Sequence, residues 1–177
     1  MIPNLTSERL YYKPLSLFHL HDYYVNWMND LDVIKYLESG GNYNLELLEE
    51  YLKGIEEKPE VLFWAIHLKE NDKHIGNIKI DPINKRHGLG EYGIMMGDKI
   101  EWGKGYAKEA SLRILKYCFE ELKLRKITLG VVFENTSAVH LYKKIGFITE
   151  GKYEKHAFHN GHYCDILRMA IFNTELE

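Results

Sequence analysis

A glycine-bearing turn between a predicted strand and a long predicted helix is the feature that most constrains this chain. Gly103 stands just before, and Gly105 begins, the range 105–122, in which apolar side chains recur at helical spacing. Glycine allows the backbone to approach a ligand closely, and the first amides of a helix lack intrahelical partners. Because the helix dipole is positive at the same end, the turn predicts an anion site to which Lys104 and Lys108 add charge.

Two better-known phosphate-binding motifs do not fit the sequence. A P-loop requires Lys followed by Ser or Thr, whereas Lys104 is followed by Gly105. The run Gly88–Gly93 satisfies the bare pattern of a dinucleotide-binding loop, but a predicted strand follows it where that fingerprint requires a helix. We interpret this run as a bend of the backbone.

Strand and helix patterns alternate along the rest of the chain, without a repeat or a linker. Strand patterns cover 8–14, 61–68, 74–80, 91–96 and 127–133, and two further strands flank Asn160-Gly161 within 151–172. Helical patterns cover 16–28, a segment after Asn44, 105–122 and 137–145. With 177 residues, this order predicts a single domain, 1–177, with a mixed sheet flanked by helices.

The composition argues against several kinds of partner. The formal net charge is −3 and neither sign forms a long block, so binding to nucleic acid or to an anionic membrane surface is not expected. The sequence contains no run of about 18 apolar residues and no basic segment followed by an apolar run at its start. We therefore expect a cytoplasmic protein.

The spacing of cysteines and histidines does not indicate a metal site. The two cysteines, Cys118 and Cys164, are too few for a disulfide framework and lack the paired spacing of a zinc site. His156, His159 and His162 gather near Cys164, but their spacing does not match a tetrahedral site. We expect solvated histidines, or the rim of an acceptor pocket, and no metal.

The glycine-bearing turn resembles a known cofactor motif. Residues 102–107, Trp-Gly-Lys-Gly-Tyr-Ala, resemble the CoA-pyrophosphate motif R/Q-x-x-G-x-G/A of the GNAT N-acetyltransferase superfamily. Trp102 stands where Arg or Gln is usual, as in the branch that contains ribosomal-protein N-terminal, spermidine and amino-sugar acetyltransferases. A cradle made of backbone should tolerate this departure.

A second block strengthens the resemblance. Residues 133–147 are similar to the family pattern N-x-x-S-x-x-x-Y-x-x-x-G-F, with matching residues at Asn135, Tyr142, Gly146 and Phe147. Ser137 comes one place early for that spacing. The segments Ser7–Leu10 and Trp27–Val33 also resemble this branch, although Leu31 replaces a frequent proline. The resemblance therefore covers nearly the whole chain.

The resemblance implies a fold, a cosubstrate and a reaction. The family fold is an α/β (α+β) three-layer domain with a mixed, mostly antiparallel central sheet of about seven strands, flanked by helices. The implied reaction is attack of a neutral amine on the thioester of acetyl-CoA, through an oxyanion, with the thiolate as leaving group. The residues implied to bind acetyl-CoA are Met95, Met96, Trp102, Gly103, Lys104, Gly105, Tyr106, Ala107, Lys108, Asn135, Ser137 and Tyr142.

Three groups are expected to carry this reaction. By resemblance, Tyr142 lies near the sulfur and donates a proton or a hydrogen bond to the departing thiolate. Glu91 is the expected general base because it begins the strand that leads to the cofactor turn. A structural role for this carboxylate and a water-relayed proton route both stay open. A backbone N–H near Met95 is expected to meet the oxyanion.

The sequence leaves several acceptors open. We expect a primary amine of a small molecule, either an amino sugar or a polyamine, and leave a homodimer open. A polyamine predicts nearby carboxylates, for which Asp30, Asp32 and Glu38 are candidates. An amino sugar predicts an aromatic pocket, for which Trp27 and the N-terminal tyrosines are candidates. The alternatives are N-terminal acetylation of a ribosomal protein, a non-catalytic acyl-CoA-binding module and a generic nucleotide-phosphate binder.

Overall fold

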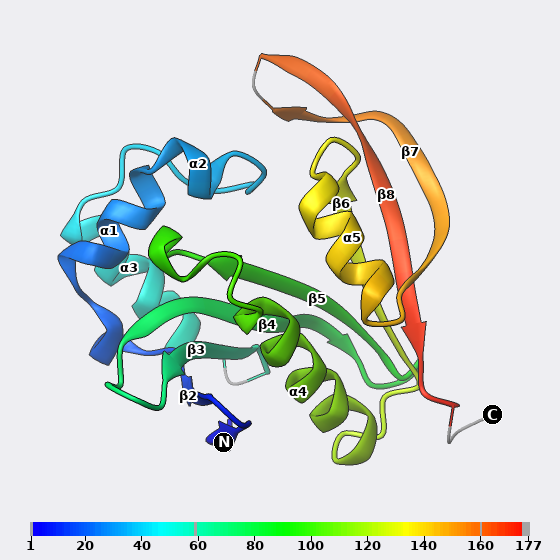
Figure 1. Ribbon diagram of the computed structural model, residues 1–177, viewed down its shortest axis with the longest axis horizontal. Coiled ribbons are helices and arrows are strands. Elements are labelled where there is room, and N and C mark those ends of the chain that lie inside the picture. The colour runs from blue at the N-terminus through cyan, green and yellow to red at the C-terminus, as the bar shows by residue number, and fades with distance from the viewer. Residues whose placement is uncertain (1, 59, 160, 175–177) are drawn as a thin grey trace. The chain divides into compact units, whose positions relative to one another are not determined.

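The computed structural model describes residues 2–58, 60–159 and 161–174. Within these residues, eight strands form one sheet in the order β1-β2-β3-β4-β5-β6-β8-β7 (Figure 1). The chain divides into two compact units, Met1–Asp81 with Gly93–Arg113 and Pro82–Tyr92 with Ile114–Glu177. Strand β5 (Leu89–Met96) and helix α4 (Tyr106–Glu120) contribute residues to both units.

The first unit is built on antiparallel strands. Strand β2 pairs with β1 on one side and with β3 on the other, and β3 pairs in turn with β4. All residues of β3 after the first are buried, as expected for a continuous apolar run in the interior of a sheet. Besides α4, the elements that begin in this unit are β1 (Leu5–Thr6), β2 (Leu10–Pro14), η1 (Leu17–His19), α1 (Asp22–Asn29), α2 (Leu31–Ile34), α3 (Leu45–Glu56), β3 (Leu62–Leu68), β4 (His74–Asn84) and η2 (Lys99–Glu101).

Helix α3 begins where its sequence predicts and covers part of the core of the first unit. The side chain of Asn44 caps the helix by accepting a hydrogen bond of 2.8 Å from the backbone N–H of Leu47. Leu48 and Leu52, one turn apart, are fully buried. They belong to a hydrophobic cluster with Leu15, Tyr24, Trp27, Met28, Val61, Phe63 and Ala65.

The continuous helix expected over 16–28 is wrong. Ser16 does act as a cap, accepting a hydrogen bond of 3.3 Å from Phe18 N, but only the short η1 follows it. The backbone is extended at Leu20 and His21, and α1 starts afresh after them. The reason is local: the His19 ring bonds back to the Ser16 backbone at 3.2 Å, closing a capping box over a single turn.

Three buried histidines stand together in the first unit. The Nε2 atoms of His19 and His67 lie 3.1 Å apart, and the His67 and His74 rings are stacked with centroids 5.1 Å apart. His74 Nε2 is bonded to Asn77 Oδ1 at 2.8 Å. Burial lowers the pKa of His19 to about 4 and that of His74 to about 3. All three rings are therefore neutral at pH 7.

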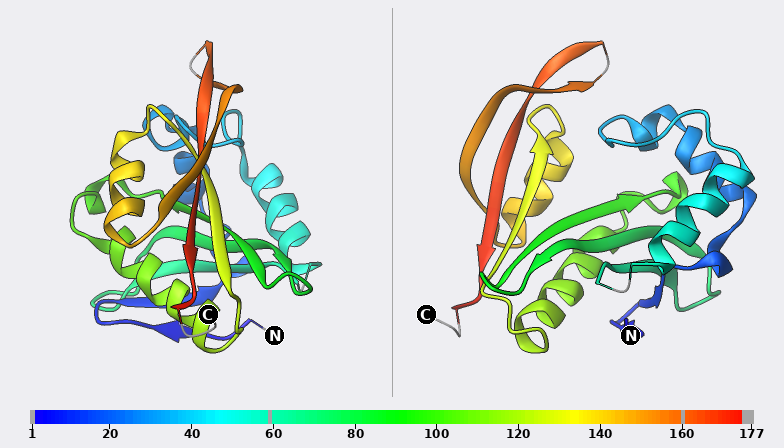
Figure 2. Two further views of the ribbon diagram at one scale, coloured as in Figure 1. Left: turned by 90° about the vertical axis from the view of Figure 1, so that its right-hand side faces the viewer. Right: turned by 180° about the vertical axis from the view of Figure 1, so that it is seen from behind.

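The second unit has a mixed sheet. The start of β5 pairs in parallel with β6 (Lys126–Val132), and β6 pairs antiparallel with β8 (His162–Phe172). Strand β7 (Ile148–His159) pairs antiparallel with β8, and these two form a long twisted ribbon in Figure 2. Helix α5 (Thr136–Lys144) lies beside β6 in both views.

The expected α/β (α+β) architecture, a mixed and mostly antiparallel sheet flanked by helices, is confirmed. The sheet has eight strands in the described residues where about seven were expected. The strand Leu5–Thr6 is only two residues long and lies before the expected strand, so no run of alternating side chains marks it. Of the expected turn pair, Asn160 lies outside the described residues, and Gly161 has the positive φ of +82° that favours glycine.

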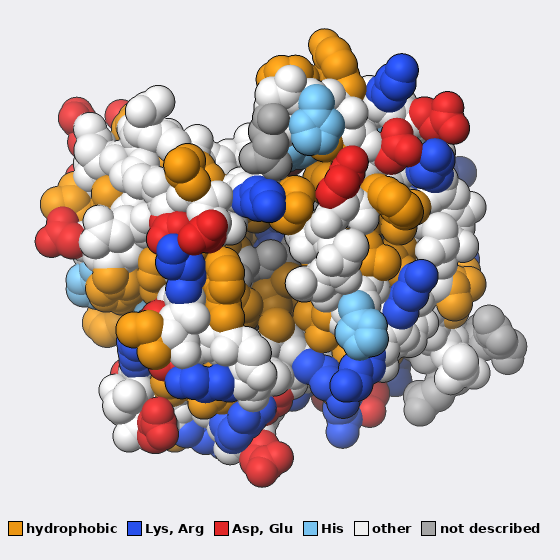
Figure 3. All heavy atoms as spheres, turned by 45° about the horizontal axis from the view of Figure 1, so that its top comes forward, with side chains coloured by type: hydrophobic (Ala, Val, Ile, Leu, Met, Phe, Trp, Pro, Cys, Tyr) orange, Lys and Arg blue, Asp and Glu red, His pale blue; other side chains and the backbone are white. Residues whose placement is uncertain are grey.

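The surface carries charges of both signs. Figure 3 shows Lys and Arg side chains interspersed with Asp and Glu side chains on the face toward the viewer, in keeping with the small net charge of −3. Among the described helices, none has both the length and the apolar character needed to cross a membrane.

Candidate active site

The turn after β5 is held close to strand β4. Gly97 N and Asp98 N both donate to Ile75 O, at 3.0 and 3.1 Å. A Cβ on Gly97 would lie 2.1 Å from the Trp27 ring, so only glycine fits there. Trp102 Nε1 donates to Met96 O at 2.8 Å, which closes the turn from the end of β5 to the start of the loop before α4. Trp102 therefore braces the turn while its side chain stays 43% exposed.

The loop before α4 has the geometry expected of an anion cradle. Gly103 and Gly105 have φ values of +76° and +84°, which L side chains rarely adopt. Glu109 N donates to Gly105 O at 3.1 Å, which is an i to i−4 helical bond. The amides of Tyr106, Ala107 and Lys108 precede that bond and so stand in the first turn, where backbone donors lack intrahelical partners. These amides can face a diphosphate.

Arg9 braces this cradle from the start of the chain. Its backbone N and Nε each donate to the Glu109 carboxylate at 2.7 Å, and its Nη1 donates to Lys104 O at 3.0 Å. The guanidinium also lies 4.4 Å from the centre of the Tyr106 ring. Ser7 Oγ donates to the same carboxylate at 2.7 Å. The sequence does not predict this role of Arg9, since the resemblance of Ser7–Leu10 to the family branch is its only signal.

The lysines of the loop differ in their surroundings. Lys104 Nζ lies 2.8 Å from Glu101 Oε2, and this hydrogen bond raises the pKa of Lys104. The Glu101 side chain is buried and also lies 3.5 Å from Lys73 Nζ. Lys108 is exposed on the first turn of α4. The positive charge of Lys104 is thus partly balanced, and the backbone amides become the main donors that the cradle offers.

Met95 and Met96 end strand β5 beside an unusually close neighbour. A Cβ on Gly76 of β4 would lie 2.4 Å from Met95 O and 3.0 Å from Met96 Cα, so the two backbones approach as only glycine permits. The Met95 side chain packs against the hydrophobic cluster of the first unit. Binding of the oxyanion by a backbone N–H near Met95 stays a prediction.

Tyr142 lies in the second unit on α5, with 8% of its side chain exposed. Its ring makes an edge contact with Tyr92 and a tilted contact with Phe147, both at 5.8 Å between centroids. Burial raises the pKa of Tyr142 to about 12. The phenol therefore keeps its proton at neutral pH, as a proton or hydrogen-bond donor must.

Asn135 and Ser137 lie at the start of α5. Asn135 caps the helix, since its Oδ1 accepts a hydrogen bond of 3.3 Å from Ala138 N. Ser137 is exposed in the first turn. The capping role explains why an Asn at this point defines the helix that carries Tyr142. The binding of acetyl-CoA by Asn135 and Ser137 stays a prediction.

Glu91 is held by neighbouring strands of the second unit. Arg168 Nη1 and Nη2 donate to its two carboxylate oxygens, each at 2.8 Å, and Thr128 Oγ1 donates at 2.5 Å. Glu91 pairs with Thr128 across β5 and β6. Arg168 pairs with Gly130, where a Cβ would lie 2.9 Å from the guanidinium. The carboxylate is thus fixed as an acceptor in a bidentate ion pair.

The candidate acceptor residues fall into two groups in the first unit. Asp30 and Asp32 both bind Lys99 Nζ, each with an oxygen at 2.8 Å, and Glu38 is exposed. By contrast, Tyr24 and Trp27 are buried in the hydrophobic cluster. Burial within the core removes these two rings as evidence for an amino-sugar pocket.

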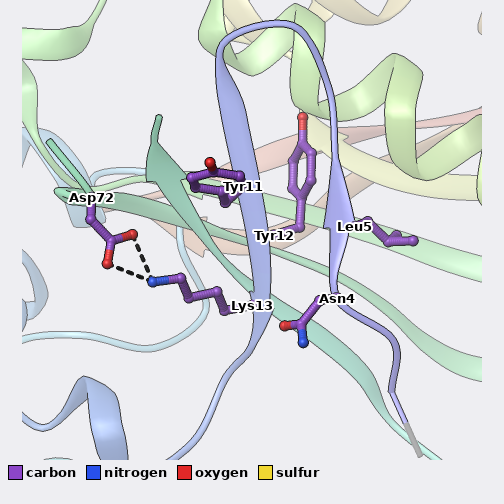
Figure 4. A pocket seen from close by; sticks show the side chains of 6 residues that line it. All are labelled: Asn4, Leu5, Tyr11, Tyr12, Lys13 and Asp72. Carbon is purple, nitrogen blue, oxygen red and sulfur yellow. Dashed lines mark hydrogen bonds and ion pairs between the residues drawn. The ribbon is translucent and has the colours of Figure 1, made fainter. Parts of the chain in front are cut away.

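An open pocket of about 420 Å³ lies over the first two strands, lined by Asn4, Leu5, Tyr11, Tyr12, Lys13 and Asp72. Figure 4 shows Lys13 and Asp72 joined at one side, where Nζ lies 2.6 Å from the carboxylate, and the Tyr12 ring pointing away from them. The Tyr12 hydroxyl is instead 2.8 Å from Ser7 Oγ. Two tyrosines of the N-terminal group therefore border this pocket, but an ion pair already satisfies its charges.

Comparisons with known proteins agree with the geometry. A family model described as an acetyltransferase (GNAT) domain matches residues 9–148. The chain is 38% identical over 130 residues to the spermidine N(1)-acetyltransferase of Vibrio cholerae, and the match covers 73% of each protein. It is 32% identical over 176 residues to the spermidine N(1)-acetyltransferase of Escherichia coli K12, covering 98% of this chain and 90% of that protein.

Solved structures show the same fold. The spermidine N-acetyltransferase of Vibrio cholerae in complex with CoA and spermine superimposes with a TM-score of 0.86 at 29% identity, covering 95% of this chain and 98% of that one. A GNAT-family acetyltransferase from Bacillus anthracis gives a TM-score of 0.82 at 26% identity. With the family model spanning most of its length, this chain belongs to the GNAT family and is an acetyl-CoA-dependent N-acetyltransferase.

Proposed function

We propose that the acceptor of the acetyl group is a primary amine of a polyamine such as spermidine. The observation that carries this proposal is the match to spermidine N(1)-acetyltransferases, at 38% identity over 130 residues and 32% over 176. The solved relative that binds CoA and spermine adds a fold match over 95% of this chain. An amino sugar, the other acceptor expected from the sequence, has no comparable support.

Acidic side chains in the first unit supply suitable chemistry for such an acceptor. The carboxylates of Asp30 and Asp32 already hold one primary ammonium group, that of Lys99. The hydrogen bond from Lys99 lowers the pKa of Asp30, so this carboxylate is charged at neutral pH. A polyamine carries the same kind of cation at several points of its length. Carboxylates of this kind, together with exposed Glu38, support a polyamine over an amino sugar, which carries a single ammonium group.

The family resemblance assigns steps of the reaction to residues of each unit. Acetyl-CoA supplies an acetyl thioester. The first-turn amides of Tyr106, Ala107 and Lys108 would hold its diphosphate, and the neutral amine would attack the thioester carbonyl. A backbone N–H near Met95 would stabilise the oxyanion, and Tyr142 would donate a proton or a hydrogen bond to the leaving thiolate.

The acceptor ammonium must lose a proton before its nitrogen can attack, and that proton requires an acceptor. Glu91 was the base expected from the sequence, but its two oxygens are engaged by Arg168 and Thr128. This engagement supports Glu91 as a positioning carboxylate that ties neighbouring strands together. The proton would then leave through water, the relay that the sequence analysis left open.

A single panel assay tests the proposal. The purified chain is mixed with acetyl-CoA and one acceptor at a time, and release of the CoA thiol is followed. The acceptors are spermidine, spermine, an amino-sugar nucleotide and a peptide with a free ribosomal-protein N-terminus. The highest kcat/KM is expected with a polyamine. A higher kcat/KM with the sugar or the peptide would identify that compound as the acceptor in place of a polyamine. Absence of thiol release with every amine would indicate a non-catalytic acyl-CoA-binding module.

A further inference from the structure

Three side chains of the kinds that bind transition metals meet at the ends of β6 and β8 in the second unit. Glu134 follows β6, and His162 and Cys164 stand two residues apart on β8. Because side chains alternate along a strand, residues two apart share one face. One ligand atom from each of the three residues lies within 4.8 Å of the other two.

The register of the sheet explains why these side chains meet. Strands β6 and β8 are antiparallel, and their last printed pair is Val132 with Ile166. The pairing runs on one step further, since Phe133 N donates to Asp165 O at 2.9 Å. Glu134 then stands in the turn that Asn135 N closes on Val132 O at 2.9 Å. The end of the β6–β8 pairing and this turn together bring Glu134 to the start of β8.

Neighbouring contacts keep this part of β8 in place. Lys152 Nζ donates to Asp165 Oδ2 at 2.8 Å, and the backbone N of Lys155 donates to Asp165 Oδ1 at 2.8 Å. Both lysines lie on β7, so Asp165 fixes the ribbon next to Cys164. Ligands held by their own backbone keep the ligand positions steady before an ion arrives.

The distance between the sulfur and nitrogen ligand atoms is close to that around a tetrahedral ion. Cys164 Sγ lies 3.3 Å from His162 Nε2. Zinc–sulfur and zinc–nitrogen bonds of about 2.3 and about 2.0–2.1 Å, at a tetrahedral angle, place the same two atoms about 3.5 Å apart. Cys164 is buried, whereas His162 and Glu134 are exposed, so the thiol forms the floor and the other two form an open rim.

We propose that Glu134, His162 and Cys164 form a binding site for a zinc-like divalent transition-metal ion. A thiolate and an imidazole favour Zn²⁺ over the oxygen-preferring Mg²⁺ and Ca²⁺. Three protein ligands leave the fourth tetrahedral position to water. Binding replaces the thiol proton of Cys164 with the metal, so one proton is released to solvent and no electron is transferred.

The spacing of the histidines and the cysteine of the C-terminal hairpin predicts no metal because that spacing does not include Glu134. Glu134 lies far from them in sequence, and only the pairing of β6 with β8 brings it near. It also directly precedes Asn135, the residue that caps α5. The ion would therefore tie the hairpin to the turn that starts the helix bearing Tyr142.

Cobalt provides a direct test, independent of acetyl transfer. The reduced full chain is titrated with Co²⁺ in a buffer without chelators, and Zn²⁺ is then added. We expect one equivalent to bind with a thiolate-to-cobalt charge-transfer absorption, which Zn²⁺ abolishes. Cys164→Ser should remove that absorption. Glu134→Gln and His162→Gln should each weaken binding by about tenfold or more, at least the loss typical of an outer-shell partner.

Matched controls separate this site from other residues of the same type. Cys118→Ala removes the other thiol, and His156→Gln removes another exposed hairpin imidazole; both should keep the wild-type titration. The proposal is overturned if the wild type shows no saturable absorption, if Cys118→Ala removes it, or if Glu134→Gln leaves the affinity unchanged. Because Glu134 and His162 are exposed, their variants decide the question even where Cys164→Ser fails to fold.

Discussion

At the scale of single residues, the proposed cradle depends on positive φ values, which residues other than glycine rarely adopt. Gly105 has a φ of +84°, and a Cβ there would lie 3.6 Å from Arg9 Nη2. Holding a non-glycine residue in this region costs about 1–3 kcal/mol. A branched side chain would also occupy the space through which a diphosphate reaches the first-turn amides. We expect Gly105→Val to raise the Kd of acetyl-CoA by about tenfold or more, equivalent to about 1.4 kcal/mol.

Isothermal titration with acetyl-CoA measures this effect, and Gly161→Val is its matched control. Gly161 has nearly the same φ, +82°, but it lies in the C-terminal hairpin. Both variants should lose stability, whereas only Gly105→Val should lose affinity. Equal affinities of the two variants for acetyl-CoA would show that the loop before α4 does not bind the diphosphate.

Tyr142 offers a second test at this scale. Tyr142→Phe keeps the ring contacts with Tyr92 and Phe147 but loses the proton donor, so kcat should fall by about a hundredfold while KM changes little. Since the pKa of Tyr142 is raised to about 12, the phenol should contribute no loss of rate between pH 7 and pH 10. Steady-state kinetics across this range provide both readings, and an unchanged kcat would make Tyr142 a packing residue.

At the scale of elements, the Glu91–Arg168 pair joins the strands around β6. Removing one partner leaves the other charge partly buried and unpaired, so Glu91→Gln and Arg168→Gln should destabilise the fold by similar amounts. If Glu91 only positions the strands, both variants should also lower kcat similarly and keep the wild-type pH profile. If Glu91→Gln loses the acidic limb of the pH profile of kcat and Arg168→Gln keeps it, Glu91 would again be the general base.

Most elements could be predicted because their signals are local. The helix start after Asn44, the glycines before α4 and the β-branched run of β6 each act within a few residues, and all three matched the structure. The break near Leu20 was missed because helical spacing continues across it. The Arg9–Glu109 contact was missed for a different reason, since it joins residues that only the folded chain brings together.

At the scale of the whole molecule, acid should destabilise the protein through its buried histidines. The folded-state pKa values of His19 and His74 lie near 4 and 3, below the ordinary 6.5. As pH falls below 6.5, the histidines of the unfolded chain bind protons that the same histidines in the folded chain do not bind. Stability is therefore fully present above about pH 6.5 and lost toward pH 4, by about 2 kcal/mol per histidine between pH 7 and pH 5.

Urea unfolding at pH 7 and pH 5 checks this slope. Lys13, Asp72 and His21 are charged or titratable neighbours of the cluster, but burial is the largest cause of each shift. His19→Phe should flatten the dependence on pH, whereas His156→Gln, an exposed histidine, should leave it unchanged. A slope that persists in full in His19→Phe would assign the acid sensitivity to other groups.

The Arg9–Glu109 contact also bears on when the enzyme becomes competent during its synthesis. These two residues are 100 positions apart, so a large loop must close before the carboxylate at the first turn of α4 finds its partner. Contacts of such separation form late, because the entropy of closure is lost before they contribute. A ribosome-bound fragment that ends before α4 would therefore fold its first strands before Glu109, the partner of Arg9, has been synthesised.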